Sequence, residues 1–169
     1  VSLSINLGEL TLPEINRFWI QNNYNMSGIE KVIILSITGG VPKYIEEILS
    51  NHSANENVIR TCFKPSVILF NEYDKIFHSI FDSRDKKLER IIKICIEKKL
   101  SPTEVAKKLG IDQNSELSTA IHILEISGFI NRDFYFKADG SMSKLSHLRV
   151  CDNYLRFYLK VIDPLKNKI

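Results

Sequence analysis

Apolar residues recur three and four positions apart along most of the 169-residue chain, a spacing that predicts amphipathic α-helices. In the N-terminal half, helix-start signals stand just before three of these stretches. Thr11 precedes a proline and a glutamate, Ser27 has a glutamate three residues further on, and Pro42 suits the first turn of a helix. We expect the helix at Pro42 to continue to residue 49, followed by a loop or frayed turn over residues 51–57 and then two further helical segments.

The pattern changes in the second half, where three predicted helices are followed by a hairpin. The middle helix has a serine–proline start at Ser101 and a glycine stop at Gly110. The third helix is expected over residues 114–127. An aromatic and β-branched stretch around Asp139-Gly140 then predicts a β-hairpin. Three helices followed by a hairpin are typical of a winged helix, which includes a helix-turn-helix.

These elements predict a mainly α fold class, with a helical bundle, a winged helix of three helices plus a β-hairpin, and a C-terminal helix. We place the bundle at residues 1–82, the winged helix at residues 83–150 and the C-terminal helix, as the start of a following segment, at residues 151–169. The chain opens at Val1 without a methionine, and we expect it to be a fragment.

Two glycines and a proline interrupt the predicted helices in the stretch "SITGGVPKYIEEI". Glycine lets backbone approach a ligand closely, and the proline ring is an apolar face of fixed shape. Gly39, Gly40 and Pro42 are therefore candidates for ligand contact. The simpler interpretation is that the glycines end one helix and Pro42 begins the next, with no ligand.

Composition narrows the function only slightly. The chain has 23 Lys+Arg against 20 Asp+Glu, a net charge of +3, and this balance by itself does not indicate nucleic-acid binding. Cys62, Cys95 and Cys151 are odd in number and show no metal-ligand spacing, which favours a reduced, cytoplasmic protein. The longest apolar run, over residues 32–37, is too short for a membrane span. Neither a catalytic residue nor a metal site is predicted.

The segment that forms the third helix of the predicted winged helix, "DQNSELSTAIHILEISG", carries Asp112, Glu116 and Glu125 but no lysine or arginine. Because cationic side chains contribute most of the affinity for phosphates, this charge is unfavourable for DNA. We expect a structural or protein-contact role, with DNA binding as the alternative. The residues that would bind nucleic acid are Asn114, Arg132, Lys137 and Lys144.

Five segments together resemble the C-terminal part of prokaryotic, chiefly archaeal-type, P-loop ATPases of the AAA/STAND superfamily. The segments are "INLGELTLPEINRFW", "ILSITGGVPKYIEEI", "ILFNEYDKIF", "EVAKKLGI…LSTAIHILEISGFI" and "LRVCDNYLRFYLKVIDP". In that family a P-loop core precedes a helical lid and a winged helix. The resemblance implies that residues 1–82 are the lid and that Gly39, Gly40 and Pro42 contact a nucleotide, with Pro42 against the adenine base.

The same resemblance implies ATP and Mg²⁺ as cofactors of a longer protein, with an N-terminal P-loop core as the partner of this chain. No GxxxxGK[ST] loop and no strand ending in paired acids occur here, so the chain is not expected to hydrolyse ATP alone or to bind a cofactor tightly. The other reading is a winged-helix transcription regulator that binds DNA. No membrane partner is expected under either reading.

Overall fold

The computed structural model describes residues 8–80 and 86–166. Helices dominate these residues, and one antiparallel hairpin completes them. The mainly α fold class predicted from the sequence is therefore confirmed. The predicted boundary between residues 82 and 83 lies outside the described residues.

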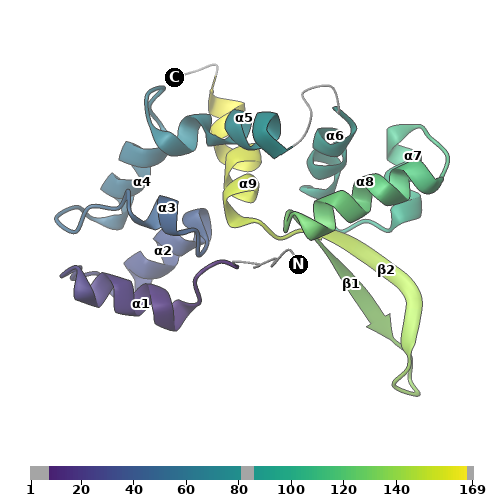
Figure 1. Ribbon diagram of the computed structural model, residues 1–169, viewed down its shortest axis with the longest axis horizontal. Coiled ribbons are helices and arrows are strands. Elements are labelled where there is room, and N and C mark those ends of the chain that lie inside the picture. Colours follow the sequence, from purple (N-terminus) through teal and green to yellow (C-terminus); the bar gives the residue numbers. More distant parts are fainter. Residues whose placement is uncertain (1–7, 81–85, 167–169) are drawn as a thin grey trace, which may run out of the picture.

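The helices of the N-terminal half form a bundle in which short connections join successive helices (Figure 1). They are α1 (Leu12–Gln21), α2 (Gly28–Thr38), α3 (Pro42–Ile45), α4 (Ala54–Cys62) and α5 (Ile68–Ile80). Capping boxes begin α1, α2 and α4. In the box at Ser27 the backbone N–H donates to the Glu30 carboxylate at 2.9 Å, and the serine oxygen accepts from the Glu30 N–H at 3.3 Å.

Two sequence predictions in the bundle are wrong. α4 begins at Ala54, inside the predicted loop, because Ser53 and Glu56 form a capping box there. α3 ends at Ile45 rather than near residue 49. The buried Asn57 side chain accepts a hydrogen bond from the Leu49 N–H at 2.8 Å and donates to the Leu49 carbonyl at 3.0 Å. These bonds take up the backbone groups that a longer helix would need.

The second half has the order of a winged helix. Its elements are α6 (Lys86–Cys95), α7 (Pro102–Leu109), α8 (Ser115–Ile126), β1 (Ile130–Phe136) and β2 (Met142–Val150). β1 pairs antiparallel with β2, with Ile130 opposite Val150. Leu100 forms a further bridge to Leu148, with N–H···O distances of 3.3 Å and 2.7 Å in the two directions. The hairpin is thereby joined to the start of α7, and the predicted winged helix is present.

The C-terminal helix lies between the bundle and the winged helix (Figure 1). It runs as α9 (Asn153–Phe157), a π-helical turn η1 (Tyr158–Ile162) and α10 (Asp163–Leu165). Pro164 has no N–H to donate, and the wider π-helical turn precedes it. Asn153 donates to the Leu35 carbonyl of α2 at 3.0 Å, and Tyr154 donates to the Leu69 carbonyl of α5 at 2.8 Å.

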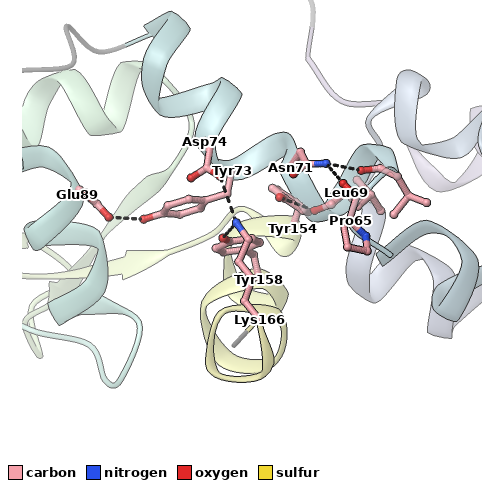
Figure 2. Close-up of polar contacts among 10 residues, drawn as sticks. Pro65, Leu69, Asn71, Tyr73, Asp74, Glu89, Tyr154, Tyr158 and Lys166 are labelled. Carbon is pink, nitrogen blue, oxygen red and sulfur yellow. Dashed lines mark hydrogen bonds and ion pairs between the residues drawn. The ribbon is translucent and has the colours of Figure 1, made fainter. Parts of the chain in front are cut away.

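One continuous apolar core joins the two halves. It contains buried residues from α2, α3, α4 and α5, from the winged helix and from the C-terminal helix. At its centre Tyr73 of α5 stacks on Tyr158, with ring centroids 4.3 Å apart (Figure 2). The Tyr73 hydroxyl donates to Glu89 of α6 at 3.1 Å. A smaller second cluster around Trp19 lies within the bundle. The bundle and the winged helix therefore share a core through the C-terminal helix.

Candidate functional site

The Gly39-Gly40 turn packs against the segment that precedes α1. The Leu10 N–H donates to the Gly40 carbonyl at 2.8 Å. A Cβ added at Gly40 would stand 2.2 Å from the Leu10 carbonyl oxygen, so no larger residue fits there. Gly39 is the C-cap of α2 and has a φ of 57°, a region that favours glycine. The close backbone approach expected from these glycines is made to the chain itself.

The Glu9 carboxylate occupies the polar face of the same turn. Its Oε2 accepts a hydrogen bond from the Gly40 N–H at 2.9 Å. A Cβ at Gly39 would lie 2.9 Å from that oxygen. The Gly40 N–H, which precedes α3, is therefore already hydrogen-bonded to a carboxylate of the chain itself, that of Glu9.

Pro42 is the first residue of α3 and is exposed. The next two residues anchor the short helix beneath it. Lys43 pairs with the buried Glu72 of α5 at 3.0 Å, and the Tyr44 ring lies 5.5 Å from the Tyr154 ring. Burial raises the pKa of the Tyr44 hydroxyl, so Tyr44 stays neutral. The proline ring is thus presented to solvent on a helix that is fixed to the shared core, while its nucleotide contact stays a prediction.

Asn114 and Arg132, two of the predicted nucleic-acid residues, make internal contacts. Asn114 is the N-cap of α8, and its Oδ1 accepts from the Leu117 N–H at 2.9 Å. Arg132 pairs with Glu125 at 2.6 Å and contacts Ser146 at 3.4 Å. Cap formation and charge pairing lower the availability of both side chains for bases or phosphates.

Other basic residues of the winged helix are neutralised in the same way. Lys87 of α6 pairs with Glu116 of α8. Lys99 and Arg149 both contact Asp133, at 2.7 Å and 3.2 Å. Hydrogen bonds from Arg149 and Lys99 lower the pKa of Asp133 to about 2. Fewer positive charges of the winged helix are therefore available for phosphates than its number of lysines and arginines suggests.

The wing combines two exposed lysines with exposed apolar side chains. Lys137 and Lys144, near the hairpin turn, form no ion pair among the residues that the structure describes. The exposed apolar side chains of the wing are Phe134, Tyr135, Phe136, Met142 and Leu145. The sequence signal for this surface is the run of three consecutive aromatic residues at 134–136, because successive side chains of a strand point to opposite faces and such a run places an aromatic ring on both.

The cysteines show no reactive environment. Cys62 and Cys95 are buried, and burial raises the pKa of each thiol to about 11. Cys151 is half-buried, and its thiol contacts the Gly128 carbonyl at 3.0 Å. Within residues 8–80 and 86–166, no three metal-ligating side chains come together. In the same residues no helix has the length and apolarity to cross a membrane.

Comparisons with known proteins add little to this geometry. No model of a known protein family matches the chain, and no curated protein sequence does. Among solved structures the chain is similar to the crystal structure of Streptococcus pneumoniae FabT in complex with DNA, at 21% sequence identity and a TM-score of 0.39. The similarity covers 59% of this chain and 66% of that one, slightly less than two thirds of its length.

Proposed function

We propose that this chain is the lid and winged-helix region of a P-loop ATPase and acts as a nucleotide-responsive module rather than as a catalyst. The observation that carries the proposal is the exposed Pro42 ring on a helix anchored in the core that the bundle shares with the winged helix. The sequence resemblance supplies the ligand class. ATP and Mg²⁺ would be held mainly by a P-loop core outside these residues.

The packing explains how contact at Pro42 would reach the winged helix. α3 contacts α5 through Lys43 and Glu72 and contacts the C-terminal helix through Tyr44 and Tyr154. Tyr158 of the C-terminal helix stacks on Tyr73 of α5. The Tyr73 hydroxyl in turn donates a hydrogen bond to Glu89 of α6. A shift of the bundle toward bound nucleotide would therefore carry the winged helix with it, as in hinge closure. The size of the shift depends on how much more tightly nucleotide binds the closed form.

The first test is the reading frame upstream of Val1. A P-loop there supports the proposal, whereas a start codon near Val1 with no P-loop contradicts it. In the protein that contains the P-loop, Pro42→Glu is expected to weaken ATP binding by about tenfold. The substitution replaces the apolar ring next to the adenine base with a negative charge. Pro13→Glu is the matched control, since Pro13 is also an exposed first-turn proline. Equal affinities for ATP in both variants would refute the contact.

DNA binding through the wing is the second candidate, favoured by the exposed Lys137 and Lys144. It predicts salt-sensitive binding of a short duplex, measured by fluorescence anisotropy. The double variant Lys137→Gln/Lys144→Gln should weaken binding and reduce the salt dependence by about two phosphate contacts. Lys64→Gln, an exposed lysine of the bundle, is the control. Absence of salt-sensitive binding at submicromolar protein would remove this candidate.

A further inference from the structure

A cavity of about 420 Å³ opens where the end of α4 meets the start of α5. Its polar and charged lining residues are Glu47, Arg60, Thr61, Ser66, Asn71 and Lys75. The Asn71 amide donates to the Pro65 and Val67 carbonyls at 2.5 Å and 3.3 Å, which holds the turn that forms one wall (Figure 2). The cavity lies outside the Pro42 region and outside the wing, and neither proposed function uses it.

Arg60 is the unusual residue of this cavity. Its Nε and Nη2 are shielded from solvent and have no hydrogen-bond partner among the described residues. Arg132 and Arg149, by contrast, each pair with a carboxylate. A guanidinium is always charged, and shielding part of it from water without a partner lowers the stability of the fold. Arg60 is half-buried, and its Nη1 is not among the shielded atoms and has no hydrogen-bond partner among the described residues, so an anion in the cavity would contact Arg60 at Nη1.

The remaining charges of the cavity are compatible with an anion. Lys75 is exposed and forms no ion pair in the described part of the chain. Glu47 also lines the cavity, but no ion pair within 4.0 Å joins it to Arg60. Arg60 and Lys75 together supply two positive charges against one negative charge. The hydroxyl of Ser66 adds a hydrogen-bond donor on the same lining.

We propose that this cavity is a binding site for a phosphate group, with Arg60 as its main recognition residue and Lys75 as a second cation. The N–H groups of arginine form charge-assisted hydrogen bonds with phosphate oxygens, and the ammonium of lysine adds a point charge. The volume exceeds that of one phosphate, so the group can be free phosphate or the phosphate of a nucleotide.

The test measures thermal unfolding of the 169-residue chain with sodium phosphate at constant ionic strength, against sodium chloride alone. A ligand that binds the folded state raises the unfolding temperature in a saturable way. Arg60→Gln is expected to weaken the apparent affinity for phosphate by about tenfold and Lys75→Gln by about threefold. Arg17→Gln, an exposed arginine of α1, is the control and should leave the affinity unchanged.

Further measurements distinguish a binding role of Arg60 from a structural role, and free phosphate from the phosphate of a nucleotide. Without phosphate, Arg60→Gln should be at least as stable as the parent chain, because it removes an unpaired charge. Tighter binding of adenosine monophosphate than of phosphate assigns the site to a nucleotide, and equal affinity assigns it to free phosphate. No saturable effect, an unchanged effect in Arg60→Gln, loss of stability in phosphate-free Arg60→Gln, or tighter binding of acetate would overturn the proposal. None of these outcomes bears on Pro42, so the two proposals fail independently.

Discussion

Replacement of Gly40 by alanine tests whether the packing of the Gly39-Gly40 turn against residues 9 and 10 stabilises the fold. The new Cβ would stand 2.2 Å from the Leu10 carbonyl oxygen and 2.8 Å from the Leu10 nitrogen, both backbone atoms. Because backbone cannot rotate away as a side chain can, the segment at residues 9 and 10 must separate from the turn. The Leu10–Gly40 hydrogen bond and the Gly40–Glu9 hydrogen bond are then both lost.

Each of these two hydrogen bonds contributes about 1 kcal/mol to the free energy of unfolding, the second being to an exposed carboxylate. Alanine offsets about 0.5 kcal/mol, since it has less conformational freedom than glycine in the unfolded chain. The expected net loss for Gly40→Ala is about 1.5 kcal/mol. At a urea dependence of about 1.5 kcal/mol per molar, the unfolding midpoint falls by about 1 M.

The assay is urea unfolding followed by the fluorescence of Trp19, which is 1% exposed and lies in the bundle. Gly28→Ala is the matched control, because nothing lies within 4 Å of the added Cβ and Gly28 is in the first turn of α2. That variant should keep its midpoint or raise it slightly. If Gly40→Ala also stays within about 0.5 kcal/mol of the parent chain, the turn does not hold residues 9 and 10, and the argument from Gly40 fails.

Three further predictions concern stability. Tyr154→Phe removes the 2.8 Å hydrogen bond to the Leu69 carbonyl and keeps the buried ring, so it is expected to lower the free energy of unfolding in urea by about 1 kcal/mol. An unchanged midpoint would show that this bond does not stabilise the contact between the C-terminal helix and α5. Ser53→Ala removes the capping box with Glu56 at the start of α4 and should cost about 1 kcal/mol in the same assay; a neutral result would argue against the cap. Asp133 has a folded-state pKa of about 2, below its unfolded value of about 3.9, so its contribution is present above about pH 4 and is lost as the pH falls toward 2. Asp133→Asn should therefore reduce the dependence of stability on pH in that acid range, and an unchanged acid profile would contradict the assignment.

Local signals account for the parts of the fold that could be predicted from the sequence. Capping boxes, first-turn prolines and glycine C-caps depend on residues within about four positions of each other, so Ser27, Ser101 and Gly110 indicate helix ends before any tertiary contact is known. The hairpin likewise follows from its turn and its β-forming residues. The fold class and the winged helix were predictable for this reason.

The local rules are weaker where a distant residue competes for the backbone. The shortness of α3 depends on Asn57, eight residues after the Leu49 groups that it binds. The missed start of α4 is a different case, since its signal at Ser53 is local and was not used in the prediction. A helix end can therefore be predicted from sequence where no distant side chain binds its backbone groups, as Asn57 binds those of Leu49.

The candidate sites depend on contacts that sequence spacing does not encode. The sequence by itself determined the residue types: two glycines and a proline before α3, and basic residues in the wing. Tertiary structure decided that Glu9 lies on the glycine turn, that Glu125 pairs with Arg132, and that Nε and Nη2 of Arg60 have no partner among the described residues. The physical reason is that charge pairing and close backbone approach act through space, between residues that only the packed core around the C-terminal helix brings together.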